Sequence, residues 1–358
     1  MQAYPPTQGP TTSSGASTIE KKDTRHLLLP VEILEKIFKE AWAAPLTIDE
    51  RITLFTSLCL ANRGILSVFV SIAFRDVHVL TPNFTSHYLW LLATRASSER
   101  NDQYLLNNAS STINELCRTL TFHVDAHMGV SARHSDANPD SASGVLMEDN
   151  KNREIAALCE MIYQLEGTFK DCVPHLRRIA IQFYDWGYHD FFDQCRTMPL
   201  PAQVTELELR YVFSPALRLV AHGLRRQYGS WPGRNMMSWE TPFVQKLIVH
   251  GASALFVSDV LTTTGNVHTL EVDDCVKLTQ MKPLPESVKT VILRTAVPPK
   301  ENAGADSWSL VKALKAGKLF DFGRELDFVL KDAGTNARSR ERLRKASHAA
   351  GVRLRFED

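Results

Sequence analysis

The feature that most constrains this chain is a six-residue pattern, apolar-x-x-apolar-x-apolar, that returns along most of its length. Its second half alternates apolar and polar residues, which predicts a β-strand with one buried face. The full copies are Cys117/Leu120/Phe122, Leu176/Ile179/Ile181, Val204/Leu207/Leu209, Val244/Leu247/Val249, Val267/Leu270/Val272 and Val288/Val291/Leu293. Weaker copies at Leu326/Phe328 and Leu354/Phe356 have Gly323 and Gly351 in the first apolar place.

Helical stretches separate these predicted strands. Apolar residues recur at helical spacing in 154–165, 215–228, 252–263, 308–319 and 337–350. Alternation of strand and helix is typical of α/β proteins with a parallel sheet. We therefore expect an α/β fold in the larger part of the chain.

The spacing of the copies indicates which kind of α/β fold to expect. Successive middle positions (120, 179, 207, 247, 270, 291, 326 and 354) are separated by 59, 28, 40, 23, 21, 35 and 28 residues. Several intervals fall near the leucine-rich-repeat period of ~20 to 29 residues. We expect an irregular leucine-rich-repeat-like solenoid over 81–358, with a parallel sheet, outer helices and a mobile loop at about 128–150. An ordinary parallel α/β domain is the alternative, because its strands also alternate.

The N-terminal part has a different character. Residues 1–24 are rich in Pro, Gly, Ser and Thr, which predicts a disordered tail. From Val31 an apolar stripe at helical spacing runs to Trp42, and Thr47 with Glu50 forms a capping box for a second helix. A third helix over 65–74 and a short strand at 76–79 follow. We expect a three-helix domain at 25–80.

Composition limits the possible functions. The net charge of +1 over 358 residues gives no overall attraction to nucleic acid or anionic lipid, so we expect neither as a partner. The longest apolar run, 65–74, is too short to span a bilayer, and no secretory signal is recognisable. The six cysteines are widely spaced, which predicts reduced thiols and a cytoplasmic or nuclear protein.

Three blocks in the N-terminal domain resemble the F-box family, in particular the divergent F-box proteins with leucine-rich repeats that are abundant in mushroom-forming fungi. Residues 29–38, LPVEILEKIF, follow the family's opening L-P-x-E-I-L-x-x-I-F. Residues 56–63, TSLCLANR, and 73–79, AFRDVHV, are similar to its second-helix and closing segments. A tryptophan common in the family after the second block is replaced here by Ile65 and Phe69, and the 43–48 insertion differs in length.

The resemblance implies a substrate-recognition adaptor of a Skp/cullin/F-box ubiquitin ligase. The helical domain would dock on a Skp-type adaptor, and through it on a cullin, while the repeats hold an unknown target protein. The expected adaptor-binding residues are Leu29, Pro30, Ile33, Leu34, Ile37, Phe38, Leu58, Leu60 and Phe69.

A physical argument supports that surface. About 50 residues cannot bury so many large apolar groups, so some should pack against another protein. The chain's own repeat domain is the alternative covering. A non-ligase repeat scaffold with a vestigial F-box therefore remains the second functional hypothesis.

No residue pattern indicates an enzyme. The chain has no GxGxxG, P-loop or GxSxG motif, and we expect no cofactor and no metal. His123 and His127 lie four residues apart, but His123 is in a predicted strand, which argues against a helical zinc site. Asp273 and Asp274 follow a strand and are interpreted as turn residues.

Candidate target-binding residues are aromatic. Loops at one edge of a solenoid often form its binding rim, so we expect Tyr184, Trp186, Tyr188, Trp231 and Trp239 to contact the target. The basic segment 338–345 could bind nucleic acid, an acidic target or an import receptor, or could simply be a solvated helix face.

Overall fold

The computed structural model describes residues 29–96, 115–125, 143–188, 199–215, 241–273, 275–294, 325–331 and 337–357, with short pieces at 217, 223, 228–230, 310–312 and 314. Its N-terminal elements are α1 (Val31–Ala43), α2 (Ile48–Ala61), α3 (Arg63–Arg75), β1 (Asp76–Val79), α4 (Pro82–Ala96), β2 (Thr119–Asp125) and α6 (Ser143–Glu166). The remaining elements are η1 (Lys170–Cys172), β3 (Arg178–Tyr184), β4 (Glu206–Val212), β5 (Lys246–His250), α9 (Ala254–Thr263), β6 (Thr269–Val272), α10 (Cys275–Gln280), β7 (Thr290–Arg294), β8 (Asp327–Lys331), α12 (Ala337–Ala349) and β9 (Arg353–Glu357).

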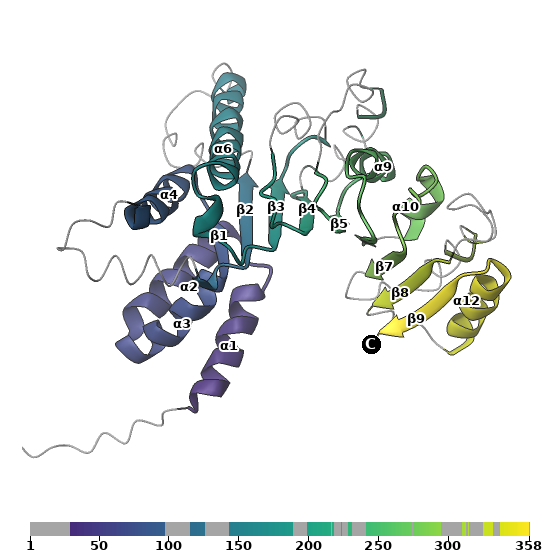
Figure 1. Cartoon of the computed structure of the whole chain (residues 1–358), viewed down its shortest axis with the longest axis horizontal. Coiled ribbons are helices and arrows are strands. Elements are labelled where there is room, and N and C mark those ends of the chain that lie inside the picture. Colours follow the sequence, from purple (N-terminus) through teal and green to yellow (C-terminus); the bar gives the residue numbers. More distant parts are fainter. Residues whose placement is uncertain are drawn as a thin grey trace, which may run out of the picture.

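The strands form one nine-stranded sheet in which spatial order follows chain order from β1 to β9. Every neighbouring pair is parallel. Crossover connections between parallel strands have the same handedness. When the strands follow one another in chain order, such connections place all the connecting helices on the same face of the sheet. Figure 1 shows α4, α6 and α9 on one face of the sheet, with the α1–α3 bundle on the opposite side at the β1 end. The expected α/β class with a parallel sheet is confirmed.

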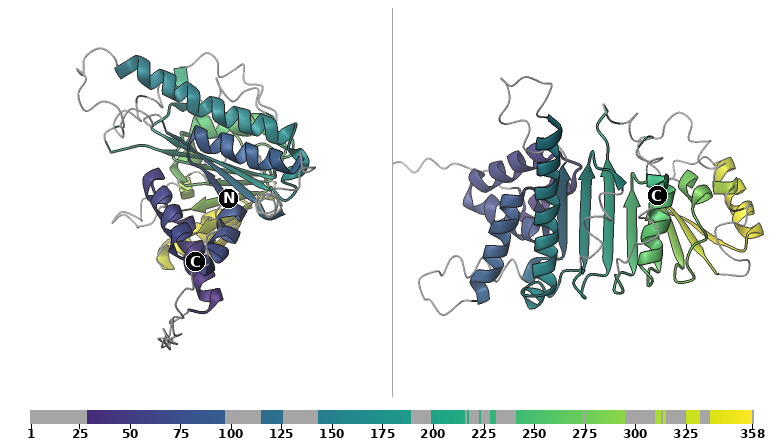
Figure 2. Two further views of the ribbon diagram at one scale, coloured as in Figure 1. Left: turned by 90° about the vertical axis from the view of Figure 1, so that its left-hand side faces the viewer. Right: turned by 90° about the horizontal axis from the view of Figure 1, so that it is seen from above.

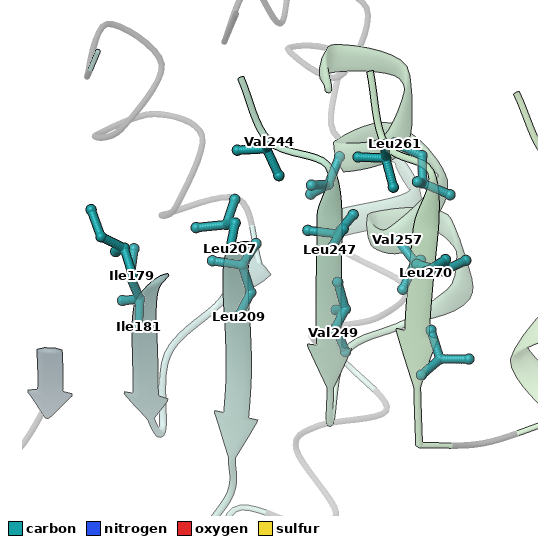
Figure 3. Close-up of a cluster of buried hydrophobic side chains, with 14 of the residues drawn as sticks. Ile179, Ile181, Leu207, Leu209, Val244, Leu247, Val249, Val257, Leu261 and Leu270 are labelled. Carbon is teal, nitrogen blue, oxygen red and sulfur yellow. The ribbon is translucent and has the colours of Figure 1, made fainter. Parts of the chain in front are cut away.

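The apolar residues of the six-residue pattern form continuous rows across the sheet. One row joins Val77, Leu120, Ile179, Leu207, Leu247, Leu270, Val291, Phe328 and Leu354 in register. Figure 3 shows members of this row and of the next row projecting from their strands beside Val257 and Leu261 of α9. These rows fill the core between sheet and helices.

The same contact geometry recurs where successive strands begin. The first apolar residue of several copies donates its backbone N–H to a carbonyl three residues earlier, as in Val204 to Pro201, Val267 to Thr264 and Val288 to Pro285. The following residue then bonds to the preceding unit, as Gln245 N to Thr205 O and His268 N to Gln245 O. The apolar pattern therefore corresponds to a repeated turn-plus-strand unit.

The register of the seventh copy, at Leu326 and Phe328, differs from the expectation. Val291 of β7 pairs with Phe328 of β8, so Phe328 rather than Leu326 holds the middle position. The predicted alignment is wrong by two residues. Leu326 and Phe328 are both buried and are two residues apart, so the alternation of apolar residues could not tell which of them holds the middle position. Leu354 keeps the expected place, opposite Phe328.

The bundle has α3 at its centre, since α1 and α2 each pack mainly on α3. Phe69 of α3 lies edge-on to Phe38 and Trp42 of α1, with ring centroids 6.1 and 5.2 Å away. The predicted capping box is present, as Glu50 N donates to Thr47 Oγ1 at 3.3 Å. The third helix begins at Arg63 rather than Ile65, because Asn62 Oδ1 accepts the N–H of Ile65 and caps it.

The other helices agree only in part with the expectation. α9 and α12 coincide with predicted helices, whereas α4 and α10 had not been predicted. α6 begins at Ser143, so 143–150 are helix rather than loop, and the rest of the predicted mobile loop, 128–142, lies outside the described residues. The predicted tail 1–24 and most of the helices expected at 215–228 and 308–319 also lie outside them.

Candidate protein-binding surfaces

Exposed apolar side chains are concentrated on the first two helices. Of the eleven large apolar residues that are exposed in the described part of the chain, seven belong to residues 29–60. These seven are Leu29, Val31, Ile33, Ile37, Ile52, Phe55 and Leu60. Ile33 and Ile37 are four residues apart and therefore lie on one side of α1, and Leu29 directly precedes the N-cap Pro30 of this helix. We call these seven residues the bundle surface.

The predicted adaptor-binding residues divide between surface and interior. Leu29, Pro30, Ile33, Ile37 and Leu60 are exposed, and Leu34 and Leu58 are half-buried against the bundle core. Phe38 and Phe69 are inaccessible, with exposed fractions of 7% and 0%, because they pack on Trp42. These two residues are corrected from contact residues to core residues.

Three further exposed residues, Val31, Ile52 and Phe55, were missed by sequence reasoning. Ile52 and Phe55 occupy the apolar positions of α2, so their spacing looked like that of a core-facing stripe. A short bundle cannot bury both sides of such stripes.

A chain of polar side chains joins the bundle to the sheet. Arg51 of α2 is buried and donates from Nη1 to Trp42 O at 2.5 Å and from Nη2 to Ala44 O at 2.9 Å. Its Nη1 also lies 3.4 Å from Nε2 of His78 on β1. His78 Nδ1 is 2.8 Å from Nε2 of His123 on β2.

The chain continues across the sheet. His123 Nδ1 lies 3.5 Å from the Tyr184 hydroxyl of β3, which donates to Gln182 Oε1 at 3.0 Å. We call Arg51, His78, His123, Tyr184 and Gln182 the junction chain. A second link is made by Trp42, whose Nε1 donates to Asp76 O at 2.8 Å.

Arg51 dictates the tautomers of both imidazoles. A guanidinium can only donate, so Nε2 of His78 must accept and its proton must be on Nδ1. Nδ1 of His78 then donates to Nε2 of His123, which places the His123 proton on Nδ1, facing Tyr184. This assignment follows from the donor and acceptor inventory, and every member of the junction chain then has a compatible neighbour.

The electrostatic surroundings keep both rings neutral. Burial lowers the pKa of His123 to about 3, with the positive charges of Arg51 and Arg210 acting in the same direction. Burial, helped by Arg51 and His123, also holds the pKa of His78 well below its ordinary value. Protonation of His78 would place an N–H opposite the Arg51 donor, and protonation of His123 would place an N–H opposite the Nδ1–H of His78. The junction chain therefore requires uncharged histidines.

The sheet face turned away from α6 and α9 carries a charge network. Glu208 of β4 is buried and pairs with Arg178 of β3, and its other oxygen lies 3.0 Å from Arg210 Nη2. Burial opposes ionisation of Glu208, but the two arginines outweigh it and lower the pKa of the carboxyl. The carboxylate therefore stays charged inside the sheet.

A second buried carboxylate repeats this arrangement two strands further on. Glu271 of β6 lies 3.7 Å from Lys246 Nζ and 3.5 Å from Arg294 Nε. The pKa of His250, 3.8 Å away, is lowered mainly by burial, so its ring is neutral at pH 7. Glu208 and Glu271 are thus buried carboxylates whose basic partners on the sheet are more exposed to solvent.

The aromatic residues expected to bind a target are mostly internal. Tyr184 is half-buried in the junction chain, whereas Trp186 and Tyr188 are buried, and both are corrected from rim residues to core residues. Tyr188 packs against Tyr211, Tyr228 and Phe256, and its hydroxyl donates to Gly251 O at 3.1 Å. Trp231 and Trp239 lie outside the described residues.

Comparison of the chain with family models, curated proteins and solved structures finds no match. The interpretation of its surfaces therefore depends on its own residues.

Asp273 lies in a bend directly after β6, where its Oδ2 accepts the N–H of Gly251 at 2.8 Å and its other carboxylate oxygen pairs with Lys277, and Asp274 lies outside the described residues. His123 lies within hydrogen-bonding distance of His78, and His127 lies outside the described residues. Cys59, Cys117, Cys159 and Cys172 form no disulfide bonds in the part that is described. Within that part, no helix combines the length and apolar character needed to cross a bilayer.

Proposed function

We propose that this protein is the substrate-recognition subunit of a Skp/cullin/F-box ubiquitin ligase. The α1–α3 bundle docks on a Skp-type adaptor, and the repeated strands with their loops bind the target protein. The single observation that carries the proposal is the bundle surface, which lies within and beside the segment that resembles the F-box opening motif.

The distribution of apolar residues supports a protein partner rather than a solvated bundle. Interfaces obtain most of their binding free energy from a few large apolar or aromatic side chains that become buried. Ile33 and Ile37 are 45% and 48% exposed, although the α1 stripe also supplies the buried Phe38 and Trp42. α1 therefore has more apolar surface than α3 covers, and its exposed side is available to a partner.

The chain's own sheet is not the covering of this surface in the described residues. The bundle contacts β1 through α3, and its polar links to the sheet use Trp42 and Arg51. Ile33 and Ile37 stay exposed in the presence of the sheet. Within the described residues Ile33 and Ile37 therefore remain available to an external protein.

The junction chain supports the second half of the proposal. A ligase subunit that performs no chemistry acts by holding its target at a fixed position relative to the adaptor. Arg51, His78 and His123 connect the bundle to β1 and β2 through side-chain contacts, although His78 is in register with Thr121 and not with His123. A target bound to the strands would therefore be held in a defined orientation to α1 and α2.

A binding experiment with purified Skp-type adaptor tests the proposal. The intact chain is compared with Ile33→Asp plus Ile37→Asp by titration calorimetry. We expect the double variant to bind at least about tenfold more weakly, since buried apolar contacts are replaced by buried charge. The matched control is Tyr163→Asp plus Phe243→Asp, which alters two large apolar residues outside the bundle that are at least as exposed as Ile33 and Ile37 and should leave adaptor affinity unchanged.

Failure of the folded, intact chain to bind any Skp-type adaptor would overturn the ligase proposal. In that case the remaining function is a repeat scaffold with a vestigial F-box. Such a scaffold would still recover target proteins, and their recovery would be insensitive to Ile33→Asp plus Ile37→Asp.

A further inference from the structure

We propose that the outer edge of β9 binds an extended acidic segment of another protein by strand addition, the added strand alternating acidic and apolar residues. This surface is at the far end of the sheet from the bundle, and the proposal does not depend on adaptor binding. Figure 2 shows β9 and α12 at the opposite end of the sheet from α1–α3.

The edge is open in the part of the chain that the structure describes. β9 is the last strand of the sheet, and it pairs there with β8 alone. Arg353 directs its N–H to Leu326 O at 3.0 Å, on the β8 side. Because successive residues of a strand turn their backbone groups to opposite edges, the N–H and C=O groups of Leu354 and Phe356 face away from β8.

The charge around this edge is strongly positive. Residues 337–357, which comprise α12 and β9, contain seven Lys and Arg against two Glu, a net charge of +5 in a chain whose total is +1. Two of these residues, Arg340 and Arg344, lie over the ring of Phe356 at 5.2 and 5.6 Å. Arg353 and Arg355 project on the other side, with side chains 61% and 62% exposed. Arg353 already pairs with Glu325 and Asp327, and Arg355 with Asp327, but both side chains remain mostly exposed and can also contact a carboxylate on an added strand.

The register of the sheet specifies where the acidic residues should lie. Along one row, opposite charges meet between neighbouring strands, as in Arg178 opposite Glu206 and Glu206 opposite Lys246. At the end of this row Asp327 lies opposite Arg353, with 3.2 Å between Oδ1 and Nε. A tenth strand would continue this alternation by placing carboxylates beside Arg353 and Arg355.

The intervening positions favour apolar residues. Leu354 and Phe356 are half-buried, with the core and α12 on one side of them. An apolar side chain on the added strand would cover the part of these residues that remains exposed. The result is an acidic-apolar-acidic-apolar segment.

A protein strand fits this edge better than other partners do. Nucleic acid would meet the arginines but has no backbone amides to pair with Leu354 and Phe356. A second β9 edge is disfavoured, because two copies would bring arginine against arginine. An acidic protein segment satisfies both the backbone groups and the charges.

The test uses the full-length chain and a ten-residue peptide of alternating Glu and Val. We expect the peptide to bind and to slow amide exchange at Leu354 and Phe356. A second peptide carries N-methyl groups on every other residue, which removes donors on one edge while keeping charge and side chains. Its affinity should be lower by about tenfold or more, since each lost backbone bond weakens binding.

A charge reversal gives an independent readout. Arg353→Glu plus Arg355→Glu should weaken the Glu–Val peptide by about tenfold and favour a Lys–Val peptide instead. The control Arg338→Glu plus Arg342→Glu changes α12 alone and should keep the preference for Glu–Val. If the N-methylated and unmodified peptides bind equally, or if the folded chain binds neither, the proposal is wrong.

Discussion

Nδ1 of His78 and Nε2 of His123 lie 2.8 Å apart, and this contact joins β1, the strand next to the bundle, to the second strand of the sheet. His123 is buried and His78, which lies beside Arg51, is half-buried, and both rings must be neutral for the hydrogen bonds to align. The orientation of the helical bundle is therefore linked to the protonation state of two histidines.

The first prediction concerns the pH dependence of stability. An unfolded histidine has a pKa of about 6.5, whereas the folded pKa of His123 is about 3, so between these values the unfolded state binds more protons. Stability is therefore retained above pH 6.5 and lost as the pH falls, by up to about 1.4 kcal/mol per pH unit from His123. Urea unfolding at pH 7.5, 6.5 and 5.5 measures the loss.

His123→Gln should have a shallower dependence on pH in this range, because the titrating group is gone. His175→Gln removes an exposed histidine and should keep the wild-type slope. Equal slopes for all three proteins would show that His123 is not held neutral.

The second prediction concerns Arg51. Arg51→Met removes the donors to Trp42 O and Ala44 O, and also the cation that lies 5.1 Å from the Trp42 ring. We expect the free energy of unfolding to fall by about 2–4 kcal/mol, since buried carbonyls lose their partners. Arg51→Lys should recover only part of it, because a single ammonium cannot reproduce the planar fork. Chemical denaturation measures this, with the exposed Arg63→Met expected to change stability by less than about 0.5 kcal/mol.

The sequence predicted the strands and most of the described helices, which depend on local periodicity. It did not predict which side chains are buried, because burial depends on the element packed against them. Alternation located all the pattern strands, because one buried face imposes a period of two. The stripe of α1 predicted a helix but could not separate Phe38, which faces α3, from Ile37, which faces solvent, since adjacent positions of a stripe look alike. Tyr188 was misplaced for the same reason, as its neighbours Tyr211 and Phe256 are far away in the chain.

The third prediction concerns Gly251, which follows β5. Its φ is +72°, and a Cβ there would lie 1.9 Å from Tyr211 O. Gly251→Ala must therefore displace the backbone of β4, and we expect it to cost about 3 kcal/mol or more. Gly265→Ala, where a Cβ meets open space, should be nearly neutral in the same thermal unfolding assay. A stable Gly251→Ala protein with an unchanged melting temperature would contradict the close approach of these two strands.

The fourth prediction concerns the buried carboxylate of Glu208. Glu208→Gln removes the negative charge between Arg178 and Arg210 but keeps the shape of the side chain. Two partly buried cations would then face each other without compensation, so we expect a loss of about 2–4 kcal/mol. The control is Glu206→Gln on the same strand, whose carboxylate is 36% exposed and lies 3.7 Å from Lys246 Nζ.

The control should cost no more than about 1 kcal/mol, because solvent screens an exposed pair. A further variant, Glu208→Gln with Arg210→Gln, removes one cation along with the acid and should recover part of the stability. If this double variant is less stable than Glu208→Gln alone, the cost does not arise from repulsion between Arg178 and Arg210. Urea unfolding of the four proteins at pH 7 separates these outcomes.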